Sequence, residues 1–74
     1  ALGIEVYPNP FIDEIIIQSE QEFNFQSELY NTLGQAVKRF NGNKLSTSEI
    51  ADGVYFLKIY QEGRYLGTTT LVKM

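Results

Sequence analysis

The chain has 74 residues and a net charge of −3, and it contains neither cysteine nor histidine. This composition excludes disulfides and the usual thiolate and imidazole metal sites, and the negative charge disfavours nucleic acid as a partner because phosphate binding needs a basic surface. No run of about 18 apolar residues occurs and no basic start precedes an apolar segment, so we expect no membrane insertion and no signal peptide within residues 1–74.

The first two expected strands flank a connector that contains two prolines. Residues 2–7 alternate apolar and other side chains, which is the pattern of a half-buried strand. Pro8 and Pro10 lack backbone donors and bias the preceding residues, Asn9 among them, toward extended geometry, so this segment cannot continue a ladder. A second strand is expected over residues 14–18, with one face formed by Ile15 and Ile17.

The middle of the chain predicts a hairpin. Residues 22–30 alternate most regularly, and their apolar face comprises Phe23, Phe25 and Leu29. The sequence Asn31-Thr32-Leu33-Gly34 is typical of a type I turn with Gly34 in the left-handed position of a bulge, which returns the chain along residues 35–40.

The second half predicts three more strands. Asn41-Gly42 marks a reversal before a short, polar strand over residues 45–50. The segment Val54–Tyr60 is apolar on both faces except at Lys58, as expected of a central strand, and its core-facing residues would be Tyr55, Leu57 and Ile59. The final strand would span residues 65–74. Six or seven short strands without a helical period predict an all-β fold, a small antiparallel β-sandwich.

The charges are divided unevenly along this order of strands. Residues 1–34 contain six acids and no base, whereas residues 35–74 contain six Lys and Arg against three acids, so the two halves carry −6 and +3. We expect ion pairs between strands from the two halves, in preference to an anionic docking face.

The sequence offers no constellation for catalysis. The serines lack a base that could activate them, and no glycine-rich loop precedes a helix to hold phosphate. The acidic pairs Asp13-Glu14 and Glu20/Glu22 match no calcium loop, and solvated strand ends explain them better. We therefore expect no enzyme activity, no metal and no cofactor.

The spacing Ile50-x-x-Gly53-x-Tyr55 resembles a tyrosine corner. It combines an apolar anchor, a glycine that permits a sharp turn and a tyrosine at a strand start. In such a corner the phenol hydroxyl bonds to the backbone a few residues upstream and fixes the connection between the two sheets of a sandwich. This structural interpretation of Tyr55 is stronger than a ligand-binding one.

Five tyrosines and five phenylalanines allow a second functional interpretation. Phe56 and Tyr60 share the face opposite the expected core, where exposed rings could stack on sugars. Small sandwiches need aromatic residues for packing, which is the default explanation.

Taken in order, the motifs resemble the type A C-terminal sorting domain of the type IX (Por) secretion system of Bacteroidota-type Gram-negative bacteria. The resemblance covers nearly the whole chain. Four segments carry it: Tyr7-Pro8-Asn9-Pro10 with Ile15 and Ile17 downstream, Leu29-Tyr30-Asn31-x-x-Gly34-Gln35-x-Val37, Ile50-x-x-Gly53-Val54-Tyr55-Phe56-Leu57-Lys58-Ile59, and Leu71-Val72-Lys73.

This resemblance implies an immunoglobulin-like sandwich without activity of its own, excised as a single domain of residues 1–74 from the C-terminus of a larger secreted protein. It also implies passage through the periplasm, recognition by the outer-membrane translocon, and removal by a surface protease of sortase type as the N-terminal cargo is attached to the cell surface or released. A second functional class remains, an immunoglobulin- or fibronectin-like module that binds carbohydrate or protein.

The resemblance also suggests which residues the machinery reads. We expect recognition through the last hairpin and the terminal strand, by Gly53, Tyr55, Leu71, Val72 and Lys73; the alternative is that all five simply maintain the fold. The family often has a lysine before the closing Leu-Val pair, where this chain has Thr70. Because Thr70 and Lys73 differ by an odd number, they face opposite sides of a strand. A receptor strand could add to the edge that residues 68–72 offer.

Overall fold

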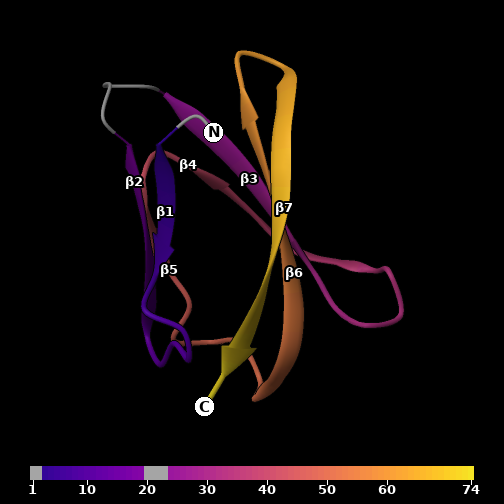
Figure 1. Cartoon of the computed structure of the whole chain (residues 1–74). Helices are drawn as coiled ribbons and strands as arrows, with labels where there is room; N and C mark the ends of the chain where they lie inside the picture. The colour runs from indigo at the N-terminus through magenta and orange to yellow at the C-terminus, as the bar shows by residue number, and fades with distance from the viewer. Residues whose placement is uncertain (1–2, 20–23) are drawn as a thin grey trace.

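The fold consists of two antiparallel sheets packed face to face. The computed structural model describes residues 3–19 and 24–74, and Figure 1 shows its strands wrapped around a single interior. The strands are β1 (Ile4–Tyr7), β2 (Glu14–Ser19), β3 (Phe25–Tyr30), β4 (Ala36–Asn41), β5 (Lys44–Ser46), β6 (Gly53–Gln61) and β7 (Arg64–Lys73).

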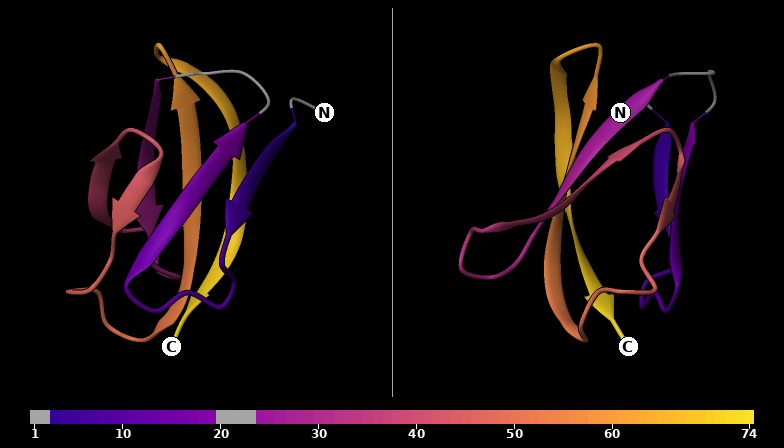
Figure 2. Two further views of the ribbon diagram at one scale, coloured as in Figure 1. Left: turned by 90° about the vertical axis from the view of Figure 1, so that its left-hand side faces the viewer. Right: turned by 180° about the vertical axis from the view of Figure 1, so that it is seen from behind.

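The strand order confirms the predicted β-sandwich. One sheet has the order β1-β2-β5 and the other β4-β3-β6-β7, and the two layers lie side by side in the right-hand view of Figure 2. Within the described ranges no residue is helical, so none forms a helix that could cross a bilayer. Such a three-on-four arrangement, with a tyrosine near the start of the penultimate strand, is that of immunoglobulin-like sandwiches.

The predicted hairpin between β3 and β4 forms as expected. The backbone N–H of Gly34 donates to the carbonyl of Asn31 at 3.0 Å, and Gly34 has a φ of 82°. The Asn31 side chain stabilises the loop further, because its Oδ1 accepts the N–H groups of Leu33 and Gln35, both at 3.0 Å. The pairing shifts by one residue after Leu29, as a bulge requires.

The predicted strand over residues 45–50 is wrong at its second half. Strand β5 ends at Ser46, and residues 47–50 form a turn in which the N–H of Ile50 donates to the carbonyl of Thr47 at 3.1 Å. The apolar alternation misled the prediction because the turn also buries Thr47 and Ile50. The expected positions of Leu2 and Phe23 lie outside the described residues.

The core lies between the sheets and uses the predicted faces. Tyr55, Leu57 and Ile59 of β6 point inward, and β6 lies between β3 and β7 as expected of a central strand. The buried apolar residues are Phe11, Ile15, Ile17, Phe25, Leu29, Phe40, Leu45, Ile50, Tyr55, Leu57, Ile59 and Leu71.

Among the described residues, two ion pairs join the acidic and basic halves of the chain, as predicted. Glu28 on β3 contacts Arg39 on β4, with 3.0 Å between Oε2 and Nε. Glu14 on β2 lies 3.9 Å from Lys44 on β5. Both pairs are between neighbouring strands, so the division of charge along the sequence reflects strand pairing.

Candidate recognition site at the terminal strand

The five residues predicted to be read by a receptor lie together on the last hairpin. In the register between β6 and β7, Gly53 is opposite Lys73 and Tyr55 is opposite Leu71, while Val72 lies between these pairs. Strand β7 is an edge strand of its sheet, so no other strand of that sheet lies on the side that faces away from β6; at the end of β7 residues 9–11 bond to this side.

Tyr55 forms the predicted tyrosine corner. Its hydroxyl donates to the carbonyl of Ala51 at 2.6 Å, and its ring is buried 6.4 Å from the ring of Phe11. Ile50 is also buried, so the turn that leads from one sheet to the other is fixed at both ends. The hydroxyl bond spans the connection between β5 and β6 and stabilises its path.

Gly53 begins β6 in a conformation that favours glycine. Its φ is 151°, which L-residues rarely adopt, although a Cβ atom there would come no closer than 3.8 Å to the ring of Tyr55. The need for glycine at position 53 therefore comes from its backbone conformation, and not from neighbouring atoms that a side chain would meet.

The end of β7 alternates between buried and exposed side chains. Leu71 is 1% exposed and Lys73 8%, whereas Val72 is 37% exposed. The Lys73 ammonium donates to the Met74 carbonyl at 3.2 Å and lies 3.9 Å from Asp52 Oδ1. Thr70 is exposed and Lys73 is buried, as predicted for two strand residues that are an odd number of positions apart. The Lys73 ammonium therefore cannot take the place of a lysine at position 70, which would lie on the outer face. Of the five residues, Val72 presents the most side-chain surface to a partner.

A segment near the N-terminus holds this strand in place, and we call residues 9–11 the clasp. The N–H of Phe11 donates to the Val72 carbonyl at 2.8 Å, and the Phe11 carbonyl accepts the N–H of Met74 at 2.9 Å. Asn9 completes the contact, because its Oδ1 accepts the N–H of Val72 at 3.0 Å and its Nδ2 donates to the Thr70 carbonyl at 3.3 Å.

The clasp is the part of the site that sequence reasoning missed. Pro8 and Pro10 do end the first strand as predicted, and both peptide bonds that precede them are cis. The side chain of Phe11 is fully buried and the Asn9 amide replaces a missing strand partner. The Pro-Asn-Pro sequence predicted a rigid connector, but it did not indicate that this connector would contact β7.

The outer face of the four-stranded sheet carries a cluster of aromatic and charged groups. Phe56 and Tyr60 share this face, as predicted, and the Tyr60 ring packs 5.7 Å from that of Tyr65. The Lys58 ammonium lies 4.6 Å from the centre of the Tyr30 ring. The hydrogen bond from the Tyr30 hydroxyl to Glu28 raises the pKa of that phenol, with burial adding to the effect.

Within residues 3–19 and 24–74, no three acidic, histidine or cysteine side chains converge as a metal site. The arrangement at β7 consists of backbone hydrogen bonds, one exposed valine and an open strand edge. An edge of this kind can pair with an extended strand of a protein partner.

The two sheets and the clasped terminal strand together define a small immunoglobulin-like β-sandwich module. Its family follows from the comparison with known families, in which the model of the secretion system C-terminal sorting domain matches residues 5–73. The chain therefore belongs to this family of type IX (Por) sorting domains, in agreement with the resemblance of its motifs. A comparison with curated proteins found no match.

Membership in this family establishes the general role of the domain. The domain is a sorting signal of type IX secretion, a system that exports its cargo to the cell surface or the surroundings, and domains of this family are in general not catalytic. The matched range begins within β1 and ends with β7, so it includes the clasp and the open edge.

Proposed function

We propose that residues 1–74 form one sorting domain that an N-terminal cargo carries across the outer membrane. In this proposal the type IX translocon recognises the folded domain after it reaches the periplasm, and a sortase-type protease removes it as the cargo is attached to the surface or released. The observation that supports the proposal most directly is the family match over residues 5–73, which includes all of the strand residues except Ile4.

Recognition is proposed to involve the end of β7. Val72 would contact the receptor, because its side chain is exposed, while Gly53, Tyr55, Leu71 and Lys73 would fix the strand that presents it. For Tyr55, Leu71 and Lys73 this division of roles follows from burial, because side chains less than a tenth exposed offer little surface to a partner; for Gly53 it follows from the φ of 151°.

The test is export of a reporter. A fluorescent protein with a signal peptide is fused in front of residues 1–74 and expressed in a bacterium with an intact type IX system and in a translocon-deficient strain. Accumulation at the surface or in the medium only in the intact strain supports the proposal. Retention of a folded fusion in the periplasm of both strains refutes it, provided that a known sorting domain is exported in parallel.

A substitution of Val72 tests the proposed readout. Removal of residues 71–74 would also delete the buried Leu71 and the contacts of the clasp, so it cannot separate recognition from folding. Val72→Ser changes the exposed side chain alone and should reduce export while the melting temperature stays close to that of the unaltered domain.

The alternative function, a binding module for carbohydrate or protein, would use the outer aromatic face. Phe56 and Tyr60 are half-buried there, and the packing of Tyr60 against Tyr65 covers part of the ring surface that a sugar would need. Titration with oligosaccharides, followed by chemical shifts of these rings, tests this function directly.

A further inference from the structure

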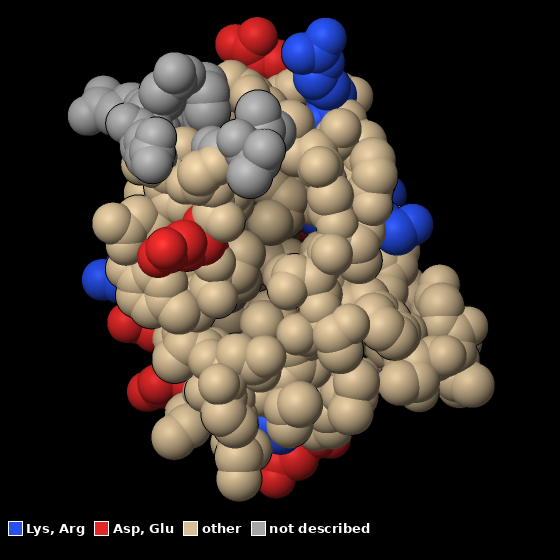
Figure 3. Space-filling model, viewed as in Figure 1, with Lys and Arg blue, Asp and Glu red and all other residues tan. Residues whose placement is uncertain are grey.

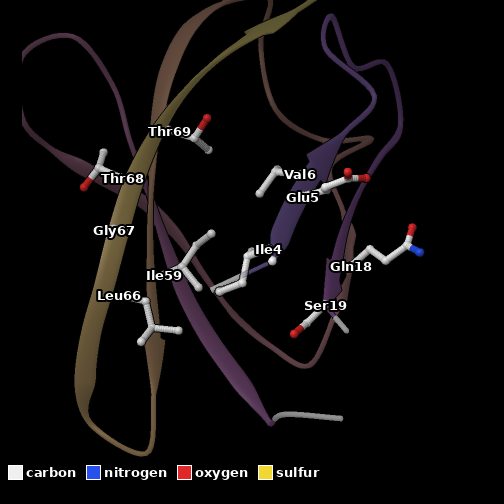
Figure 4. A pocket seen from close by; sticks show the side chains of 11 residues that line it. Ile4, Glu5, Val6, Gln18, Ser19, Ile59, Leu66, Gly67, Thr68 and Thr69 are labelled. Carbon is white, nitrogen blue, oxygen red and sulfur yellow. The ribbon is translucent and has the colours of Figure 1, made fainter. Parts of the chain in front are cut away.

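A groove opens along one side of the sandwich, between the edge strands of the two sheets. It has a volume of about 740 Å³, and β1 forms one wall while β7 forms the other. Ile4 and Val6 face Ile59 across it, as Figure 4 shows. The side of the molecule in Figure 3 is hollowed between these strands and is bordered mostly by uncharged side chains. Glu5 is the single charged residue among the described residues that line the groove.

The groove exists because β7 lacks large side chains at two of its inward positions, 67 and 69, although it has one at Leu71. Gly67 is opposite Ile59 and Thr69 is opposite Leu57, and residues opposite each other on paired strands project to the same face. Both partners are buried, so positions 67 and 69 face the interior, where a sandwich usually places large apolar residues. A Cβ atom added at Gly67 would have no atom within 4 Å, so the space above it is vacant.

On the side that faces away from β6, the backbone groups of Thr68 in β7 have no hydrogen-bond partner among the described residues. In an antiparallel ladder, successive residues direct their N–H and C=O groups alternately toward the partner strand and away from it. Both groups of Val72 bond to the clasp, on the side away from β6, so those of Thr68 point the same way. In the described part of the chain, no hydrogen bond outside the strand ladders reaches the backbone of Thr68.

The clasp demonstrates what this edge can bind. Phe11 forms a parallel bridge with Lys73, so the chain itself places extended backbone against the end of β7. The clasp ends its contacts at Thr70, and residues 66–69 beyond it span roughly 14 Å at about 3.4 Å per residue, which is within the usual range of strand lengths. A second extended segment could continue in line with the clasp.

We propose that this groove is the docking site for an extended strand donated by a protein of the secretion machinery. The strand would pair with β7 along residues 66–69 and insert an aliphatic side chain over Gly67, between Ile4 and Ile59. This inference rests on the proposed sorting function and names the contact through which the domain would be read. A groove with Ile4, Val6, Ile59 and Leu66 in its lining, beside backbone groups of an edge strand, suits a peptide backbone with apolar side chains, whereas phosphate needs a basic site and no Lys or Arg is among the described lining residues.

The first test fills the open space above Gly67 with a larger side chain at the same position. Gly67→Val projects into the groove, where there is space for it, so the variant should melt at or above the temperature of the unaltered domain. Thr68→Val is the matched control, because Thr68 lies next in the strand and its side chain points away from the groove (Figure 4). We expect Gly67→Val to reduce reporter export at least about tenfold, equivalent to roughly 1.4 kcal/mol of binding, and Thr68→Val to leave it unchanged.

The second test removes one backbone donor. Thr68→Pro deletes an N–H that points away from β6, a position where an edge strand tolerates proline, and Thr68→Ala keeps the donor as its control. Folded Thr68→Pro should lose export while Thr68→Ala retains it.

The outcomes separate the two proposals. Normal export of folded Gly67→Val and Thr68→Pro overturns the docking site while leaving the sorting function intact. Failure of the unaltered fusion to be exported refutes the sorting function and, with it, this inference. If the unaltered domain is a dimer in sedimentation experiments and both variants are monomers, the occupant is a second copy of the chain, which also overturns a strand donated by the machinery.

Discussion

The hydroxyl of Tyr55 offers a clean measure of what the tyrosine corner contributes to stability. Tyr55→Phe removes the hydrogen bond of 2.6 Å to the Ala51 carbonyl and leaves the ring, with its packing against Phe11, in place. Ala51 is exposed, so water can replace the lost donor and no buried acceptor is left unpaired. The expected cost is therefore the net value of one neutral hydrogen bond, about 1 kcal/mol.

This loss is large enough to measure in a domain of this size. A change of about 1 kcal/mol lowers the melting temperature of a 60–100-residue domain by about 4–8 °C, and with a urea m-value near 1 kcal/mol/M it moves the urea midpoint by about 1 M. Calorimetry and urea titration followed by circular dichroism would both detect it. Tyr65→Phe is the control, because the Tyr65 hydroxyl bonds only to the exposed Thr68 side chain. Equal midpoints for Tyr55→Phe and the unaltered domain would refute the corner as a stabilising element.

Three further predictions concern the clasp, the start of β6 and the outer face. Phe11→Ala should cost about 3–5 kcal/mol, because the ring is fully buried, and circular dichroism should show a largely unfolded chain; a cooperative melt near that of the unaltered domain would contradict this. Gly53→Ala should cost about 1–3 kcal/mol in urea titrations because its φ of 151° strains an L-residue, and Gly67→Ala, with open space around its Cβ, should cost less than half as much. The pKa of Tyr30 is raised by its bond to Glu28 and by burial, so the folded state keeps this proton to a higher pH than the unfolded state does. Its stabilisation is complete below the ordinary pKa of about 10 and is lost as the pH rises through the folded value; Tyr30→Phe should therefore flatten the alkaline fall in melting temperature, and an unchanged fall would exclude this cause.

Most of the sandwich could be predicted because its strands are regular and amphipathic. In β2 and β6 the inward residues recur at every second position, so alternation alone identified both the strands and the faces that pack. The turn at Gly34 was predictable for a different reason, since few residue types adopt its positive φ. The strand over residues 45–50 was extended too far because burial continues past Ser46 at Thr47 and Ile50, although the three-residue step between these two is that of a turn and breaks the alternation of a strand.

The pairing of distant segments could not be predicted in the same way. Nothing in the local sequence of Asn9 indicates that its side chain bonds to Val72, because the contact depends on how both sheets are stacked. The groove was hidden for the same reason: Gly67 interrupts an otherwise β-favouring strand, but whether its missing side chain leaves a vacancy depends on the position of β1. The sequence placed the five proposed recognition residues on one hairpin, and the structure adds that Val72 is the exposed one among them.

The clasp also has a consequence for the timing of folding in the cell. It joins atoms 61 and 63 positions apart along the chain, so nearly the whole domain must be present before these bonds can form. A nascent chain in which residues 64–73 are still inside the ribosome, or inside a membrane channel, lacks β7 and therefore leaves β6 and the interior exposed. The domain cannot close while it is being threaded through a pore, and it becomes complete only once Met74 has emerged on the far side.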